Sequence, residues 1–79
     1  MIDRLLGKKV IGIKQSTKAI KNGDGVVLYV AEDADSKLIN PLVQLAKDKG
    51  LEVNFIETMK ELGKMCGIEV GSAATLMLE

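Results

Sequence analysis

The sequence predicts an α/β protein: a three-layer α/β/α sandwich with a small mixed, mostly parallel sheet. Three observations lead to this fold class. Short apolar runs alternate along the chain with segments of helical periodicity, as they do in βαβ proteins. Residues 26–31 are apolar throughout, which is typical of a central strand buried on both faces. The 79 residues are 47% hydrophobic and 28% charged, which suits one domain, residues 1–79, with a thin core.

Local signals define the elements of the first half of the chain. Residues 2–6 are predicted to form one or two helical turns. Residues 10–13 carry β-branched side chains and predict a short strand. Residues 15–21 are amphipathic and predict a helix, which Gly23 ends because glycine accepts the left-handed conformation. The strand at 26–31 follows.

The middle of the chain predicts a loop and then a helix. The loop covers residues 32–36, and a short helical turn starts at Lys37, with the residues before it as caps. Asn40 and Pro41 predict the start of the main helix, because proline suits the first helical position. Gly50 is predicted to end this helix.

The last third predicts a strand, a helix and a final strand. Residues 51–56 alternate in polarity and predict the first strand. Thr58 and Glu61 have the spacing of a capping box, which opens a helix over 59–66. A loop then leads to a strand over 73–78.

The composition excludes several classes of chemistry. The chain has no His, which removes Ser-His-Asp and Cys-His nucleophilic machinery and histidine metal sites. One Cys forms neither an internal disulfide nor a thiolate metal cage, which suits a reducing compartment. Since the sequence offers no convincing nucleophile-base pair either, we expect no metal, no cofactor and no enzyme activity. Two aromatic residues do not provide a row of base-stacking rings. With no apolar stretch near the ~20 residues that span a bilayer, we expect a cytoplasmic protein and no membrane partner.

The net charge of zero conceals a strong asymmetry. Residues 1–21 hold six basic residues and one acidic residue, a net charge of +5, and residues 22–79 carry the compensating −5. Such asymmetry is typical of proteins with a basic binding face, although the two segments could also interleave on a mixed surface.

The segment G-I-K-Q-S-T-K, residues 12–18, lies where a strand passes into a helix. A helix N-terminus offers free N–H groups and partial positive charge, which suit a phosphate. Lys14 and Lys18 add two charges, Ser16 and Thr17 add hydroxyl donors, and Gln15 can read a base edge. The alternative is a solvated helix start with Ser16 as its cap.

Two further segments are candidates for binding. The acids of A-E-D-A-D-S, residues 31–36, do not follow a calcium-loop pattern, and we interpret them as helix caps and salt-bridge partners. The apolar side chains of I-E-V-G-S-A, residues 68–73, could pack against an unstacked base, or Ile68 and Val70 could complete the core. Cys66 is predicted to be an inert buried thiol.

Four stretches together resemble the L-seven-Ae (kink-turn-binding) family of ribosomal proteins, in its bacterial form. They are G-I-K-Q-S-T-K at 12–18, V-L-Y-V-A-E-D-A-D-S at 27–36, E-L-G-K-M-C-G at 61–67 and I-E-V-G-S-A at 68–73. The resemblance implies the α/β/α sandwich and binding of kink-turn RNA, a sharply bent helix with tandem sheared G·A pairs. Ribosomal RNA and riboswitch leaders are both compatible with it, as is association with the ribosome.

The resemblance also implies which residues touch RNA. Those expected in the groove at the G·A pairs are Gly12, Ile13, Lys14, Gln15, Thr17 and Lys18. Those expected around the flipped-out nucleotide are Asp35, Ile68, Glu69, Val70 and Gly71.

Two residues depart from the common family motif, and an alternative function follows from them. Lys14 stands where Asn is usual, and Gln15 stands where Glu is usual. Lys14 only donates, so guanine O6, guanine N7 or a phosphate becomes its natural acceptor. The alternative is a protein-interaction scaffold of the same fold that does not bind RNA. The sequence leaves the cellular RNA and the oligomeric state open.

Overall fold

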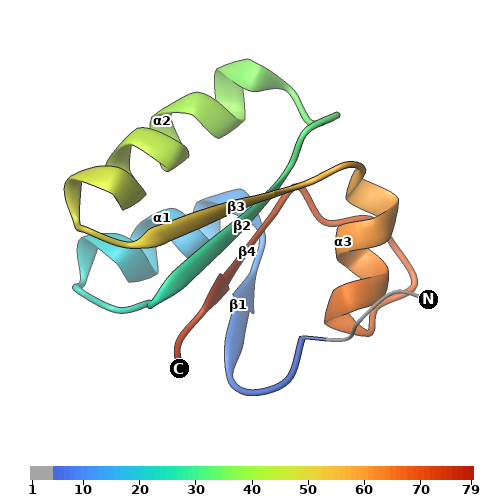
Figure 1. Ribbon diagram of the computed structural model, residues 1–79, viewed down its shortest axis with the longest axis horizontal. Helices are drawn as coiled ribbons and strands as arrows, with labels where there is room; N and C mark the ends of the chain where they lie inside the picture. The colour runs from blue at the N-terminus through green and yellow to red at the C-terminus, as the bar shows by residue number, and fades with distance from the viewer. Residues whose placement is uncertain (1–4) are drawn as a thin grey trace.

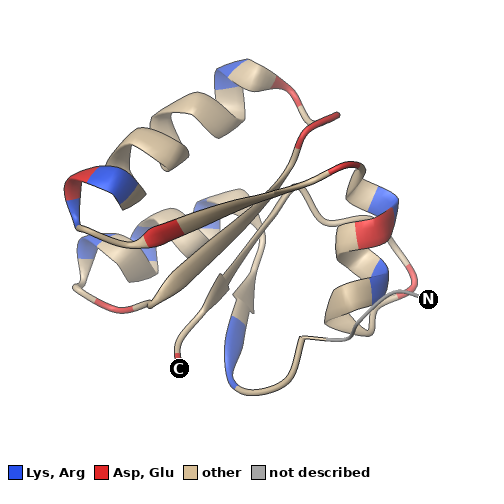
Figure 2. Cartoon of the chain, viewed as in Figure 1, with Lys and Arg blue, Asp and Glu red and all other residues tan. Residues whose placement is uncertain are grey.

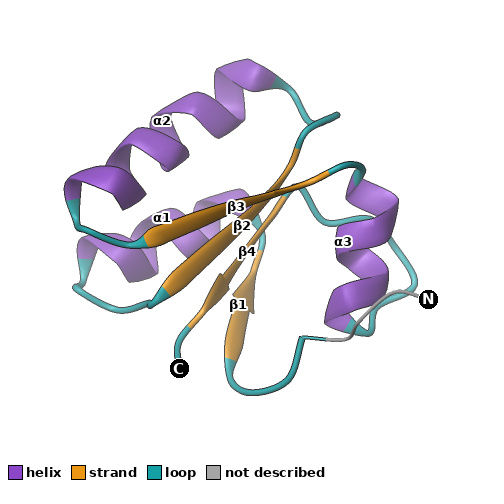
Figure 3. Ribbon diagram, in the orientation of Figure 1, coloured by secondary structure: helices purple, strands orange, loops and turns teal. Residues whose placement is uncertain are grey.

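The computed structural model describes residues 5–79, which form a four-stranded sheet covered by helices on both faces (Figure 1). α1 and α2 cover one face and α3 covers the other, so the predicted three-layer α/β/α arrangement is confirmed (Figures 1 and 3). None of the helices described over 5–79 is long and apolar enough to cross a bilayer. In chain order, the elements are β1 (Lys9–Ile11), α1 (Ile13–Lys21), β2 (Val27–Ala31), α2 (Ser36–Asp48), β3 (Glu52–Ile56), α3 (Met59–Cys66) and β4 (Ala74–Met77).

The sheet has the strand order β1-β4-β2-β3 and is mixed, as predicted. The expected predominance of parallel pairing is wrong, because only β2 and β3 pair in parallel, with Val27 opposite Glu52 and Ala31 opposite Ile56. β4 runs antiparallel to both β1 and β2. The physical reason is that the loop after α3 reaches the sheet at the end where β2 ends, with the Ala31 N–H bound to the Ala73 carbonyl, so β4 runs back between β1 and β2 in the reverse direction.

This topology brings four segments to one end of the sheet, which we call the carboxyl edge. β1 and β2 both oppose β4, so they point the same way, and β3 points with them. The last residues of β1, β2 and β3 therefore lie beside the first residue of β4. Ligand sites in open α/β sheets form at such edges.

The core has one cluster on each face of the sheet. Leu28, Val30, Ile20 and Leu42 pack between the sheet and the α1–α2 layer. On the other face, buried Ala31 packs with Leu62, Cys66 and half-buried Tyr29 beneath α3. Successive residues of β2 thus enter opposite clusters, which confirms that this strand is buried on both faces.

α2 begins earlier than predicted. Its N-cap is Asp35, whose carboxylate accepts the Lys37 N–H at 2.9 Å, and it runs through Pro41 to Asp48 without a break. The predicted start at Asn40 and Pro41 is therefore wrong. Pro41 leaves the Lys37 carbonyl without its helical donor, but both residues are exposed, so water can replace the missing N–H.

α3 has the predicted bounds, and part of its predicted cap. Thr58 Oγ1 accepts the Glu61 N–H at 3.0 Å, and Gly67 ends the helix in the left-handed region at φ 78°. The return bond from the Glu61 carboxylate is not found among the described residues. Instead, the Asp33 carboxylate accepts the Met59 N–H at 2.8 Å, which joins the loop after β2 to the start of α3.

At the N-terminus, the helical turns expected over 2–6 lie largely outside the described residues. Leu5 and Leu6, which are described, are not helical. The Leu5 N–H donates to the Met65 carbonyl at 2.7 Å, so this segment is tied to the end of α3.

Gly63 allows the loop 68–72 to approach α3. A Cβ at Gly63 would overlap the Val70 carbonyl oxygen and would lie 3.0 Å from the Gly71 Cα. We expect Gly63→Ala to lower the free energy of unfolding by about 1–3 kcal/mol, because backbone atoms cannot yield to the added methyl group. We expect this loss of stability even though alanine stabilises an isolated helix by roughly 1 kcal/mol relative to glycine. Denaturant unfolding measures the change.

Lys64→Ala is the matched control, because Lys64 is the next residue of α3 and is exposed. Its effect should stay within about 0.5 kcal/mol. A Gly63→Ala protein as stable as the parent would contradict the close approach.

Candidate nucleic-acid interface

α1 starts at the carboxyl edge from a glycine whose backbone no other residue adopts readily. Gly12 is the N-cap, with φ 109° and ψ 151°, in a region that is essentially restricted to glycine. Its N–H donates to the Ala74 carbonyl at 2.8 Å, and its carbonyl accepts the Ser16 N–H at 3.0 Å. A Cβ at Gly12 would meet nothing within 4 Å, so the start of the helix is open to an approaching ligand.

The first turn of α1 carries uncompensated positive character. It contains no acidic residue, and no side chain caps it. Within residues 5–79, the N–H groups of Ile13, Lys14 and Gln15 have no hydrogen-bond acceptor. Three free N–H groups and the positive end of the helix dipole suit a phosphate or a base acceptor.

The predicted polar side chains of α1 lie on its solvent side. Lys14, Gln15 and Lys18 are exposed, and they line a surface depression that continues past Lys21. Thr17 lines it too, but its hydroxyl donates to the Ile13 carbonyl at 2.8 Å. The groups left free in this depression therefore include three ammonium groups, those of Lys14, Lys18 and Lys21, and the Gln15 amide in the first turn of the helix.

Ser16 does not contribute to this surface, which corrects the expectation that it adds a hydroxyl donor. Its side chain is fully buried, and its hydroxyl donates to the Val10 carbonyl at 3.4 Å. It is not the helix cap either, since Gly12 occupies that position. Ser16 faces the sheet because the helical period places it on the same side as Ile20.

The loop 68–72 divides between core and surface. Ile68 is half-buried and packs against the cluster under α3, so the core interpretation holds for this residue. Val70 is 71% exposed, and Glu69 and Gly71 are exposed beside it. A Cβ at Gly71 would lie 3.1 Å from the Met59 Cβ, so the loop lies flat on the start of α3.

Ser72, which the sequence did not single out, connects this loop to α1. Its N–H donates to the Met59 carbonyl at 3.0 Å, and its hydroxyl donates to the Ala74 carbonyl at 2.9 Å. The same Ala74 carbonyl accepts the Gly12 N–H. The start of α1 and the loop 68–72 therefore meet at one backbone oxygen. A serine directly before an apolar strand was the available sequence signal.

Two acidic residues of the loop after β2 have a structural role. Asp35 caps α2 and Asp33 caps α3, so their interpretation as helix caps is confirmed. The Ala31 N–H donates to the Ala73 carbonyl at 2.9 Å, which sets this loop beside the beginning of β4. Cys66 is buried, as predicted, and its sulfur lies 3.0 Å from the Thr75 hydroxyl.

Comparison with known protein families identifies relatives of this chain. The model of the Ribosomal protein L7Ae/L30e/S12e/Gadd45 family matches residues 5–79. The chain belongs to this family.

Individual members of the L7Ae/L30e/S12e/Gadd45 family are similar over most of the chain. RNA-binding protein TTE2299 of Caldanaerobacter subterraneus subsp. tengcongensis is 40% identical over 73 residues, covering 92% of this chain and 89% of the relative. RNA-binding protein YbxF of Geobacillus stearothermophilus is 43% identical over 72 residues, covering 91% and 88%. Large ribosomal subunit protein eL8 of Halobacterium salinarum is 44% identical over 68 residues, but these cover only 57% of that protein and 85% of this chain.

A solved structure shares the fold of this chain. The Giardia lamblia 15.5kD RNA binding protein superposes with a TM-score of 0.83 at 24% identity, over 90% of this chain and 60% of that one. At this identity the likeness shows the fold alone.

The conformation of Gly12 gives a testable prediction. We expect Gly12→Ala to lower the free energy of unfolding by about 1–3 kcal/mol, because alanine is strained at this φ and ψ although space is free around it. Chemical denaturation measures the change. Gln15→Ala, in the same turn and exposed, should alter stability by less than about 0.5 kcal/mol. Equal stability of the two variants would show that the turn relaxes around alanine.

Proposed function

We propose that this protein is a non-catalytic RNA-binding protein that recognises and stabilises kink-turns through their tandem sheared G·A pairs. The observation that carries the proposal is the open start of α1, where three free N–H groups lie in the same turn as the exposed Lys14 and Gln15. Lys18 extends this surface by one turn.

The family relationship supports RNA as the ligand. Relatives that match this chain over nearly their whole length are named RNA-binding proteins, and a longer relative is a ribosomal protein. The property common to these names is an RNA partner. Association of this chain with the ribosome remains part of the proposal, since it spans 57% of the archaeal ribosomal protein.

The chemistry of α1 fits paired purines in a groove. Lys14 can donate to guanine O6 or N7 or to a phosphate, and Gln15 can both donate to and accept from a base edge. The three free N–H groups of this first turn suit the backbone of a tightly bent strand, where phosphates lie close together.

The loop 68–72 supports a second point of contact. Exposed Val70 offers an apolar side chain on the loop that meets the start of α1 through Ser72, at the Ala74 carbonyl. An unstacked base can pack on such a side chain, and the family resemblance implies Glu69, Gly71 and Asp35 around that base. Contacts available only in the bent form stabilise that form by shifting its population.

The first test is specificity. A kink-turn RNA should bind more tightly than the same RNA with its G·A pairs replaced by Watson–Crick pairs, as measured by fluorescence anisotropy at fixed salt. Equal, weak binding to both RNAs would remove the claim of kink-turn recognition. Absence of binding by a folded protein would instead favour the protein-interaction scaffold.

The second test concerns individual side chains. We expect Lys18→Ala to weaken kink-turn binding by roughly tenfold or more, the scale of a lost hydrogen bond involving a charged group. Gln15→Ala should weaken it by roughly two- to tenfold, the scale of a lost hydrogen bond between neutral groups. Both residues are exposed, so the melting temperature should stay nearly constant. Lys64→Ala, on the opposite face of the sheet, is the matched control and should bind like the parent. Loss of the fold in either test variant would mean that the side chain has a structural role.

The third test uses salt. Each lysine contact with a phosphate releases a counterion, so affinity should fall as salt rises. We expect Lys18→Ala to reduce the slope of log affinity against log salt by about one unit, whereas Lys64→Ala leaves it unchanged. An unchanged slope in Lys18→Ala would show that Lys18 does not contact a phosphate.

A further inference from the structure

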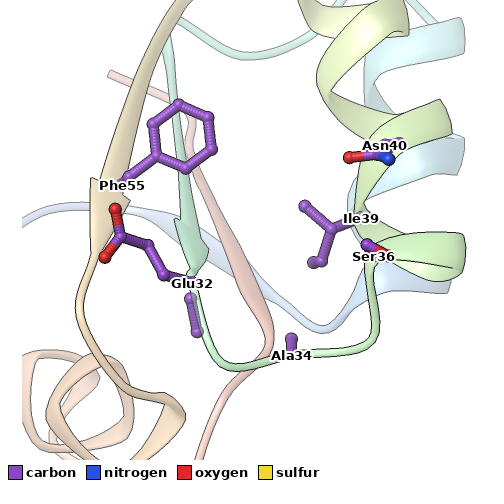
Figure 4. Close-up of a pocket in the computed structure, with 7 residues that line it drawn as sticks. Glu32, Ala34, Ser36, Ile39, Asn40 and Phe55 are labelled. Atoms are coloured by element: carbon purple, nitrogen blue, oxygen red, sulfur yellow. The ribbon is translucent and has the colours of Figure 1, made fainter.

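A small pocket lies apart from α1, where β2 ends and α2 begins. Its volume is about 260 Å³, and Ala31 and Ala34 are among the residues that line it. Figure 4 shows the Phe55 ring of β3 on one side of this pocket and Ile39 and Asn40 of α2 on the other. The pocket is therefore a slot between an aromatic ring and a helix.

The Phe55 ring, which forms one side of the pocket, is half exposed to solvent. Phe55 is one of two aromatic residues in the chain and is 52% exposed, while Ile39 opposite it is only 5% exposed. The core therefore does not use much of the ring surface, and one face of the slot is apolar and preformed. A flat group inserted beside the ring would complete the burial of Phe55.

The pocket also has a free carboxylate. The loop after β2 carries three acids, of which Asp33 and Asp35 accept backbone N–H groups as helix caps. Among the described residues, the Glu32 carboxylate has no hydrogen-bond partner, and its side chain runs along the pocket toward Phe55 (Figure 4). Lys37, the nearest basic residue in the sequence, does not line the pocket. The free carboxylate of Glu32 therefore favours a cation.

The size of the pocket limits what fits. Sites for small molecules are usually about 300–1,000 Å³, so a pocket of about 260 Å³ suits one side chain better than a cofactor. Arginine matches its walls. The guanidinium can stack on Phe55, pair with the Glu32 carboxylate and donate to the Asn40 amide oxygen, while its methylene stem lies on Ile39.

We propose that this slot binds an arginine side chain presented by a partner protein. The proposal does not depend on the proposed RNA function. α1 packs over β1 and β4 as well as against α2, whereas the slot lies between α2 and β3, at the opposite edge of the same face of the sheet. A partner in the slot would therefore leave the α1 surface free.

The test is an NMR titration of the ¹⁵N-labelled full chain with acetyl-Gly-Arg-Gly-amide. We expect the largest amide shifts in residues 31–40 and at Phe55. The same peptide with Gln in place of Arg should produce much smaller shifts there. We expect Phe55→Leu, which keeps an apolar wall but removes the ring, to weaken binding about two- to five-fold. Glu32→Gln should weaken it by a similar factor.

Glu57→Gln is the matched control, because Glu57 is an exposed acid next to the end of β3 that does not line the pocket. It should bind the arginine peptide like the parent. Shifts spread over all exposed acids, or equal weakening by Glu57→Gln and Glu32→Gln, would overturn the proposal in favour of general charge attraction. If Phe55→Leu fails to fold, the comparison of the two glutamate variants still decides.

Discussion

The arrangement of the candidate nucleic-acid interface depends on one backbone oxygen, the carbonyl of Ala74. It accepts the Gly12 N–H at 2.8 Å and the Ser72 hydroxyl at 2.9 Å, and so holds the start of α1 against the loop 68–72. Ala74 begins β4, whose four residues are all buried between β1 and β2. Two surface segments, 60 positions apart in the chain, are thus attached to the most deeply buried strand. A site fixed in this way is ordered before its ligand arrives, which reduces the entropy lost on binding.

A buried polar chain supports this attachment from below. The Ser72 hydroxyl lies 3.0 Å from the Thr75 hydroxyl, which in turn lies 3.0 Å from the Cys66 sulfur of α3. No buried side-chain N or O atom in the described residues lacks a hydrogen-bond partner. Fully satisfied networks of this kind fix geometry, since any shift would leave a polar group unpaired. The role of Cys66 is therefore to hold β4 and α3 in register rather than to react.

The sequence predicted most of the structure that neighbouring residues determine. Its predictions failed where two local signals compete or where residues distant in the sequence decide. The bounds of α3 follow from Thr58 and Gly67, which act within one turn, and they were predicted correctly. The direction of β4 depends on the end of the sheet at which the loop after α3 arrives, and no local pattern encodes it. Pro41 resembled a helix start because proline favours the first helical position. The helix instead begins at Ser36, directly after the Asp35 cap. The lysines of α1 were placed on its outer side from periodicity alone, whereas the bond from Ser72 to the Ala74 carbonyl is visible only in the fold.

The charge asymmetry of the chain takes a definite form in three dimensions. α1 carries Lys14, Lys18 and Lys21 with no acid, and the loop after β2 carries Glu32, Asp33 and Asp35 with no base (Figure 2). The helix packs over β1 and β4, and the loop lies at the end of β2 beside β3, so the two charges do not neutralise each other by interleaving. A polyanion is attracted to the first surface, and a basic group is attracted to the second. A net charge of zero is thus compatible with two surfaces that select different partners, because selection depends on the local field and not on the total.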